Sequence, residues 1–503
     1  MRPRKPVLTL CLPLLLAGCA TSAIEMAPER PDRPWTPAVT PGGEIVAGSP
    51  SRGSTVGGYV LPANPALGVI APSPSLDTAK PYSLAELIDI AESTNPKTRI
   101  AWDEARRAAL AAGIAESTYL PKITVTAVGG YQHSNGATGS ESLRGTVAAA
   151  SLLWLLFDFG ERQAVVESAR QASVISNIAF TAAHQQLIYD VSVAFYAYAA
   201  AQAGIETASA SLRNAGAVQV AAEDRYKHGI GTVIEVAQAR QAVAQAKLAL
   251  VQATGGAQDS YLALITAMGI SPLTKIKIAD VSGRKLSASM VAPVETMISQ
   301  ALARRPDVLS AYAAEKASLA NVRAAKAEFM PKVFVSATGS HNSGTLRVTG
   351  LPGFGGESPT MNVDSNRTGG IIVAGVTVPL FDGGRRAAQL DQARAAADSA
   401  KARLTQAQDD AVRQIAVADN ALRTSLESVA AAEALVVAAQ TTFDAALGAY
   451  RSGVGSSTDM TIAETQLLQA KNAATDAYST ALSSAATLAL ATGALGSAPD
   501  YGL

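Results

Sequence analysis

The chain has 503 residues with 41 basic and 41 acidic side chains, so its formal net charge is zero and no broad electrostatic attraction to nucleic acid is expected. Alanine is abundant and only 5% of the residues are aromatic, which is typical of long, closely packed helices. The sequence contains no nucleophile motif, phosphate-binding loop, metal-ligand spacing or paired catalytic acids, so it predicts no enzyme, no cofactor and no metal site.

The first 18 residues have the pattern of a lipoprotein signal peptide. Three basic residues lie within the first five positions, and the apolar run 7–16 that follows is too short to span a bilayer. The run ends in Leu16-Ala17-Gly18-Cys19, which resembles a bacterial lipobox, so cleavage would leave Cys19 as the lipidated first residue. Ala20, rather than Asp, follows it, as in outer-membrane lipoproteins. An ordinary signal peptide with a chance cysteine is the alternative.

Residues 19–81 are predicted to form a tether or an extended wrap. They are rich in Pro, Gly and Ser, and fourteen of the 24 prolines lie at or before Pro81. Because Cys11 would leave with the signal peptide, the mature chain would hold one acylated cysteine and no disulfide.

One short motif occurs twice. Its copies are Leu156-Phe157-Asp158-Phe159-Gly160 and Leu380-Phe381-Asp382-Gly383-Gly384, which lie 224 residues apart (380 minus 156). Each follows an apolar, strand-like run and precedes a long alanine-rich run without proline. The aspartates are predicted to cap the helices that follow, and the glycines would let the chain turn sharply. The predicted strand–helix hinges are Asp158, Gly160, Pro379, Asp382, Gly383 and Gly384.

The two motifs belong to an internal duplication. The offset of 224 residues holds downstream, where Tyr226 aligns with Tyr450. Upstream the offset is 210 residues, since Pro121 aligns with Pro331, so the second copy has an insertion of fourteen residues (224 minus 210) within 344–367. The predicted segments are a first repeat at 82–269, a connection at 270–292, a second repeat at 293–495 and a tail at 496–503.

Each repeat is predicted to contain a helix, a β-hairpin and a pair of long helices. Ser83 and Glu86 form a capping box, and Asn95-Pro96 would bend the first helix. No proline lies within 160–227, which predicts a helix about 100 Å long. The first repeat is predicted to hold a helix to Thr118, strands 122–133 and 144–157 around a turn at 134–142 (hairpin 122–157), and helices 160–227 and 232–268, the last with a candidate kink at Gly255-Gly256. The second is predicted to hold a helix at 294–329, strands 332–341 and 367–381 (hairpin 332–381), a helix at 385–451 and a last helix that ends near Thr492.

The four predicted strands match the length of tilted transmembrane strands. Their charged residues, Lys122, Arg144, Lys332 and Arg367, lie at the predicted ends, which leaves the interiors uncharged. Four strands cannot close a barrel, and open edges cannot face lipid, so several copies must pool their strands. Two copies would give a filled eight-stranded barrel and three a twelve-stranded barrel with a lumen. The alternative is a soluble antiparallel sheet between helical arms.

These residues resemble the TolC-like outer-membrane efflux channels. The resemblance covers about residues 80–495 and rests on Leu-Phe-Asp-x-Gly in both halves, on Pro379, and on the Tyr226/Gly229 and Tyr450/Gly453 turns. It implies an α+β membrane protein whose copies form a homotrimer, with a twelve-stranded barrel in the Gram-negative outer membrane and an α-helical tunnel across the periplasm. It also implies docking on a periplasmic adaptor and a proton-driven inner-membrane transporter.

The resemblance places adaptor docking at the helix turns, because the family uses these tips for that contact. The glycines would permit tight reversals and leave the backbone open to a partner; the alternative is that they only make the turns. The residues concerned are Gly229, Ile230, Gly231 and Thr232 in the first turn, and Gly453, Val454, Gly455 and Ser456 in the second.

The resemblance also implies an acidic ring that closes the pore just after the second turn. Asp459 matches that position, and Glu235 is its counterpart in the first half (235 plus 224). Three carboxylates around a narrow mouth would favour cations and repel one another. The family's second acidic position is Ile462 here, so the network would be thinner. The alternative for Asp459 is a solvated residue in a first helical turn.

The function expected from these observations is a passive exit duct for small molecules. The mouth would open when the tips engage the adaptor and a bistable helix packing relaxes. The same architecture could serve type I protein secretion, and the residues of the duct do not separate the two. A lipid-anchored periplasmic coiled-coil scaffold without a pore is a further alternative, against which the two uncharged hairpins speak.

Overall fold

A computed structural model describes residues 27, 31, 35, 37–46, 60–68, 76–136, 139–280, 294–344 and 368–495. The predicted signal peptide, Cys19, most of the inserted loop and the tail 496–503 lie outside these residues. The chain divides into two compact units, Met1–Leu76 and Asp77–Leu503. In the first unit, β1 (Ala38–Val39) pairs antiparallel with β2 (Ile45–Val46), and a short helix, η2, spans Pro65–Gly68.

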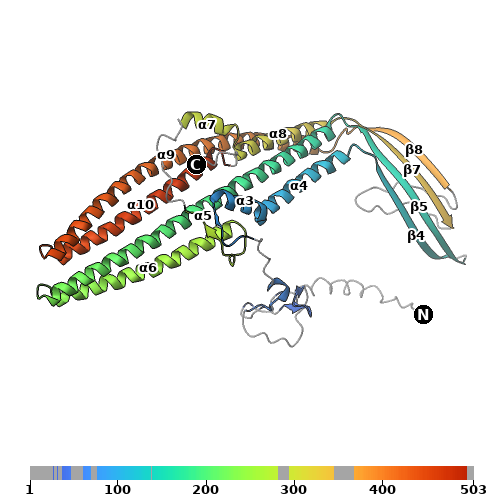
Figure 1. The fold of residues 1–503 in the computed structure, drawn as a ribbon. Coiled ribbons are helices and arrows are strands. Elements are labelled where there is room, and N and C mark those ends of the chain that lie inside the picture. Colours follow the sequence, from blue (N-terminus) through green and yellow to red (C-terminus); the bar gives the residue numbers. More distant parts are fainter. Residues whose placement is uncertain are drawn as a thin grey trace, which may run out of the picture. The chain divides into compact units, whose positions relative to one another are not determined.

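The second unit is built from two long helical hairpins (Figure 1). In the first repeat α5 (Glu161–Lys227) packs along α6 (Val233–Ala267), and in the second α9 (Arg385–Ser452) packs along α10 (Ser457–Ala491). The 67 residues of α5 span about 100 Å at 1.5 Å per residue, as the sequence predicts. Through the predicted kink site at Gly255-Gly256, α6 continues without a break.

Shorter helices pack along α5 and α9 beyond the ends of α6 and α10. They are α3 (Leu84–Thr94) and α4 (Pro96–Ser117) in the first repeat, and α7 (Val294–Leu302) and α8 (Pro306–Ala327) in the second. Since α4 packs on α5 and α8 on α9, each long helix is flanked by two shorter ones (Figure 1). The capping box at Ser83 is confirmed. The single helix predicted over 294–329 is wrong, because Pro306 starts a new helix, as Pro96 does in the first repeat.

The same elbow joins the shorter helices in both repeats. Asn95 precedes α4, and its Nδ2 donates to the carbonyl of Ala267 at the end of α6, at 2.9 Å. Arg305 precedes α8, and its Nη1 donates to the carbonyl of Ala491 at the end of α10, at 2.6 Å. These bonds satisfy carbonyls that a helix end leaves without partners. A two-residue parallel pairing of β3 (Pro81–Tyr82) with β6 (Lys277–Ile278) closes the first elbow.

The four long strands form one antiparallel sheet in the order β4-β5-β7-β8. Their bounds are Lys122–Gly136 for β4, Gly139–Phe157 for β5, Lys332–Gly344 for β7 and Thr368–Thr377 for β8. The pairing of β5 with β7 joins the two repeats, and it leaves β4 and β8 as the edges.

Two strand predictions are wrong. The predicted turn at 134–142 is largely strand, since the ladder continues to Gly136 opposite Gly139, and Arg144 therefore lies inside β5. The strand predicted over 367–381 ends at Thr377, because Pro379 cannot donate a ladder hydrogen bond.

The register gives the sheet two different faces. Ile123 and Val125 of β4 lie opposite Leu152 and Ala150 of β5, so these side chains share one face. On the other face, Val147 of β5 lies opposite Asn342 of β7, and both are buried. Large exposed apolar side chains on the first face are Ile123, Val125, Trp154, Ile372 and Val376. The second face is mixed. Its hydroxyl side chains are Thr124, Thr126, Ser151, Ser336, Thr338 and Ser340, and its large exposed apolar side chains are Leu153, Ile371 and Val373.

Candidate functional site at the hinges and helix tips

The two hinges are alike in their hydrogen bonds. The Asp158 carboxylate accepts from the backbone N–H of Gly160 at 3.3 Å and from that of Arg162 at 2.9 Å. The Asp382 carboxylate accepts from the N–H of Gly384 at 3.2 Å and from that of Arg386 at 3.1 Å. Each aspartate thus takes free N–H groups of the following helix. The cap positions, however, are Gly160 and Gly384, with φ of 92° and 88°, and not the aspartates as predicted.

An arginine completes each hinge. The Nε of Arg162 donates to Asp158 at 2.8 Å, and the Nε of Arg386 donates to Asp382 at 2.7 Å. Their Nη1 groups reach back to strand-end carbonyls, at Leu155 (2.7 Å) for Arg162 and at Pro379 (3.0 Å) for Arg386.

The sequence analysis missed these arginines. The signal was present, since both stand at the same place after the repeated motif. Each guanidinium joins the end of a strand to the start of a helix, so the aspartate and the arginine act as one clamp.

The two hinges share a left-handed backbone position but differ in the residue that occupies it. Gly383 has φ of 70°, and its counterpart Phe159 is also left-handed, with φ of 54°. Among the described residues, Phe159 is the only one other than glycine with positive φ. Its ring packs edge-on against Phe157, with 4.6 Å between ring centroids. The first hinge therefore holds a conformation that glycine adopts at lower cost.

The helix tips are two turns of the same construction. In the first, the N–H groups of Ile230 and Gly231 both donate to the carbonyl of Arg225, at 3.0 Å. In the second, the N–H groups of Val454 and Gly455 donate to the carbonyl of Ala449, at 3.1 and 3.0 Å.

The glycines and caps fix both turns. Gly229 and Gly453 have φ of 75° and 86°, and a Cβ on Gly231 or Gly455 would lie within 3.0 Å of the preceding helix end. Thr232 caps α6 by accepting from the N–H of Glu235, and Ser456 caps α10 by accepting from that of Asp459. The turns therefore need these glycines whatever else they do.

Apolar side chains stand exposed at both tips. Ile230 is 63% exposed and Val454 85% exposed, although each lies at the end of a helical pair. Exposed apolar neighbours in the first two turns of the returning helices are Val233, Ile234 and Ile462. An exposed apolar surface on a polar, hydrogen-bonded turn is typical of a contact surface.

The first and second tips meet through Tyr450. Its side chain is only 1% exposed, and its hydroxyl donates to Oε2 of Glu235 at 3.0 Å. The guanidinium of Arg225 lies over the Tyr450 ring, 4.8 Å from the centroid, and its Nη1 donates to the Tyr450 carbonyl at 3.0 Å. Burial and the hydrogen bond to Glu235 raise the pKa of Tyr450 to about 12. The hydroxyl therefore keeps its proton, and can donate it to Glu235, at any physiological pH. The contact of Tyr450 with Glu235 and Arg225 is called the tip lock below.

The two acidic residues singled out by the sequence lie in different environments. Glu235 is partly buried, and its Oε2 also lies 3.8 Å from Nε of Arg225. Asp459 is exposed and accepts from the Ser456 hydroxyl at 2.7 Å. The structure therefore brings Glu235 to Tyr450 and Arg225, and not to Asp459.

A buried cluster lies behind the tip contact and draws on all four long helices. It supports the Tyr450 ring, so the lock rests on close packing as well as on hydrogen bonds. Its residues are Val218, Ala221, Ala222, Val236, Ala239, Ala439, Phe443, Tyr450, Met460, Ala463, Leu467 and Ala470.

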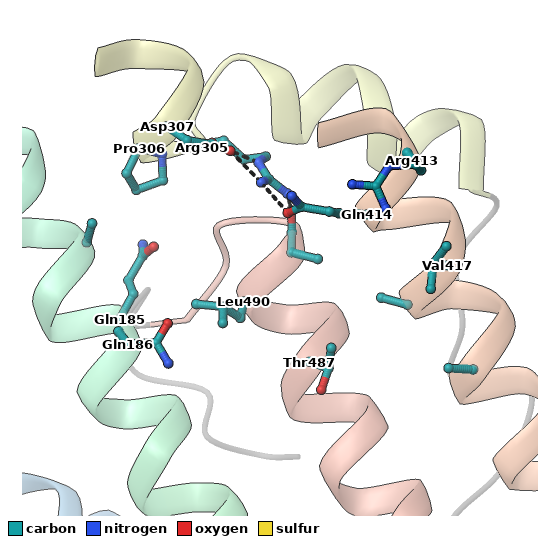
Figure 2. Close-up of a pocket in the computed structure, with 14 residues that line it drawn as sticks. Gln185, Gln186, Arg305, Pro306, Asp307, Arg413, Gln414, Val417, Thr487 and Leu490 are labelled. Carbon is teal, nitrogen blue, oxygen red and sulfur yellow. Dashed lines mark hydrogen bonds and ion pairs between the residues drawn. The ribbon is translucent and has the colours of Figure 1, made fainter. Parts of the chain in front are cut away.

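A cavity of about 480 Å³ lies at the second elbow, between α5, α8, α9 and α10 (Figure 2). Gln185 and Gln186 point into it from α5 (Figure 2). Its buried charge, Arg305, is engaged by Asp307 and by Gln414, at 2.6 and 2.8 Å. The polar groups of Arg305 are therefore used to hold the elbow together. Among the described residues no group of three or more His, Cys, Asp and Glu side chains could hold a metal ion.

Comparison with known proteins gives a consistent match over both repeats. The family model described as "Outer membrane efflux protein" matches residues 87–270 and 297–494. Protein CyaE of Bordetella pertussis is 28% identical over 347 residues, which cover 69% of this chain and 70% of that protein. Outer membrane protein OprJ of Pseudomonas aeruginosa is 26% identical over 377 residues, covering 74% and 75%.

The fold has solved counterparts. The crystal structure of the outer membrane protein VceC from Vibrio cholerae superposes with a TM-score of 0.69. The superposition covers 82% of this chain and 96% of that one, at 24% sequence identity. The helices and the four-stranded sheet are therefore arranged as in that protein.

The hinge clamp gives a first prediction. The hydrogen bond and charge of Arg386 lower the pKa of Asp382, so its carboxylate stabilises the fold above its unfolded pKa and this contribution is lost as the pH falls through the lowered value. Replacing Asp382 by Asn is expected to lower the thermal midpoint at pH 7. The midpoint of the variant should then decrease less between pH 7 and pH 3 than that of the wild type. Circular dichroism melts check this. Asp391→Asn, at an exposed pair on the same helix, is the matched control and should change neither value; equal effects of the two variants would contradict the clamp.

The tip contact gives a second prediction. Tyr450→Phe removes the hydroxyl that binds Glu235 and keeps the ring. Loss of about 1 kcal/mol of hydrogen bonding should raise hydrogen exchange of backbone amides at both tips roughly fivefold. Tyr312→Phe, at an exposed tyrosine on α8, should leave the tips unchanged. Unaltered exchange at the tips in the Tyr450 variant would show that the hydroxyl does not hold them together.

Proposed function

The chain belongs to the outer membrane efflux protein family, and from this premise we propose that three copies of it form the passive exit duct of a tripartite efflux system. The chain is an outer-membrane channel of an efflux system, extends into the periplasm and is not an enzyme. The rest of the proposal concerns the assembly, the partners and the residues that close the duct.

The sheet is the observation that carries the proposal. Within the described residues it has two edges, β4 and β8, whose outward backbone groups have no strand partner. Lipid cannot satisfy such groups, so the edges must pair with other copies. Three sheets of four strands give twelve, which leave a lumen. The apolar face with Ile123, Val125 and Ile372 suits lipid, and the hydroxyl-bearing face suits the lumen.

The helices continue the duct on the periplasmic side. Exposed apolar side chains along α9 include Val417 and Leu435, which lie five turns apart on one face of the helix. One 18-residue window of α9 is apolar enough to cross a membrane by length and composition alone. We assign this face to contact with the next copy. Packing along α10 covers another side of α9, and the exposed apolar side chains are left without a partner in the described part of the single chain.

The hinges mark the boundary between barrel and tunnel. At the second hinge Leu380 and Phe381 are about 90% exposed in the single chain, while the clamp of Asp382 and Arg386 beside them is largely shielded. In a ring of copies these apolar side chains face a neighbour or the lipid boundary, and the clamp holds the change from strand to helix.

The tips are the docking surface for a periplasmic adaptor. Gly229 to Thr232 and Gly453 to Ser456 form two like turns that present Ile230 and Val454 to solvent. The adaptor would in turn engage an inner-membrane, proton-driven transporter, which supplies the energy that this chain has no residues to supply.

Two elements close the mouth. Asp459 from each copy supplies an exposed carboxylate near the tips, and three of them would form a ring that favours cations. Glu235 holds the two helical pairs of one copy together, because it accepts from Tyr450 and lies beside Arg225. Adaptor binding at the turns would open the mouth by separating the helical pairs.

The chain is anchored by a lipid on Cys19. The support is the Leu16-Ala17-Gly18-Cys19 motif and the proline-rich segment that follows it. Such a segment lets the anchor reach the membrane while the packed unit stays in register with its neighbours.

The gating role of Asp459 is tested by conductance. Asp459→Ala should raise the single-channel conductance or the open probability in planar bilayers, because it removes the acidic ring. Asp476→Ala, at an exposed position further along α10, is the control and should behave as the wild type. An unchanged closed state in the Asp459 variant would remove the gating role.

The lipid anchor is tested by mass. Purified protein should carry diacylglycerol and an amide-linked acyl chain on Cys19, and Cys19→Ser should lose this added mass. Intact-protein mass spectrometry measures both. An unmodified N-terminus beyond residue 19 in the wild type would support an ordinary signal peptide instead.

A further inference from the structure

The duplication pairs each residue of the tip lock with a twin 224 positions away. Glu235 corresponds to Asp459, and Tyr450 corresponds to Tyr226. The structure shows one pair in contact, Glu235 of the first repeat with Tyr450 of the second, at 3.0 Å. The other pair, Tyr226 and Asp459, is not in contact within the chain.

Both members of the second pair are exposed. The Tyr226 side chain is 50% exposed, whereas its twin is 1% exposed. Asp459 is exposed, whereas Glu235 is partly buried. In the described part of the chain the hydroxyl of Tyr226 has no hydrogen-bond partner, and the contact found for Asp459 is with its own cap, Ser456.

A ring of three copies supplies the missing contact. Around such a ring first and second repeats alternate, so each second repeat meets the first repeat of the next copy. We infer that the hydroxyl of Tyr226 in the next copy donates to the carboxylate of Asp459, and that this bond is the lock between copies. The inference rests on the proposed trimer and deepens it by assigning Asp459 a partner.

The two tips have the same local geometry, so the second repeat can present its acid to a tyrosine as the first repeat does. Both turns direct two N–H groups to one carbonyl, that of Arg225 or of Ala449. Both returning helices start from a hydroxyl cap that binds the N–H of the acidic residue, Glu235 or Asp459. The tyrosine and the acid therefore leave their helices at the same positions in each repeat.

We call the contact between neighbouring tips a seam. The seam inside a copy and the seam between copies differ in strength. Within a copy Arg225 clamps Tyr450 from above its ring and through its carbonyl. The twin of Arg225 is Ala449, which has no group to clamp Tyr226 of the next copy. Asp459 is also one methylene shorter than Glu235. The seams between copies are therefore the weaker ones, and the mouth opens along them first.

Conductance separates this lock from a charge ring. Tyr226→Phe keeps all three carboxylates, so a ring alone predicts no change. The variant loses one hydrogen bond at each of the three seams, so the seam lock predicts a rise in open probability of at least about fivefold, the factor expected for a single lost bond. It also predicts that Tyr226→Phe combined with Asp459→Ala opens no further than Asp459→Ala alone, because alanine leaves the tyrosine hydroxyl no acceptor. Wild-type closure in Tyr226→Phe, or additive effects in the double variant, would overturn the inference.

A gain of closure is a second functional test. Ala449→Arg would place a guanidinium where Arg225 stands in the first repeat, and Gly455 would flank it as Gly231 flanks Arg225. The variant should lower the open probability below that of the wild type only when Tyr226 is present. The same fall in a Tyr226→Ala background would contradict the seam lock.

Cross-linking tests the contact without reference to transport. The detergent-purified double variant Tyr226→Cys, Asp459→Cys is treated with a short bis-maleimide, because residues joined by a tyrosine–carboxylate bond lie too far apart for a disulfide. Covalent dimers and trimers on a denaturing gel are expected. The matched pair Glu235→Cys, Tyr450→Cys should link only within a chain and stay monomeric. The single variants control for reaction at Cys19.

The outcomes distinguish the inference from the function on which it rests. A trimer by light scattering that forms no intermolecular link in the Tyr226, Asp459 variant, while the matched pair reacts, overturns the seam lock and leaves the duct intact. A monomer by light scattering overturns the proposed assembly itself, and with it the lock. Intermolecular links together with the conductance rise of Tyr226→Phe establish the inference.

Discussion

A strand edge inside a lipid bilayer cannot remain unpaired, and this constraint governs the molecule. The sheet of β4, β5, β7 and β8 has two such edges, an apolar face and a face that carries hydroxyls together with exposed apolar residues. Each lost backbone hydrogen bond in hydrocarbon costs several kcal/mol, so a single copy has no stable place in the membrane. In the proposed assembly, closing the strands into one barrel would also bring the long helices into a ring.

The change from strand to helix is handled by the same clamp in both repeats. An aspartate takes the first N–H groups of the helix, and an arginine bonds the aspartate and the last strand carbonyls. Duplication thus gives six like hinges in a ring of three copies. The proposed ring would also have six seams at the mouth, three inside the copies, held by Glu235, Tyr450 and Arg225, and three between copies, where Ala449 would leave the clamp incomplete.

The sequence predicted the long helices, the two hairpins and the turns, because proline, glycine and capping residues act locally. It misjudged the strand ends and the break at Arg305-Pro306, where a duplicated proline was read as part of one helix. It singled out Asp158 and Asp382 but not Arg162 and Arg386, although the motif repeats them. It could not foresee that Glu235 meets Tyr450, since a contact between residues 215 positions apart depends on how the two helical hairpins pack.

The most direct test of the account is the mass and shape of the full-length protein extracted from outer membranes in detergent. Light scattering, corrected for detergent, should give three times the mass of the chain, and negative-stain images should show a tapered body with a barrel at one end. A protein that is released without detergent once Cys19 is replaced, and that has the mass of one chain, would contradict the pooled barrel. A lipid-anchored helical scaffold would then be the better account.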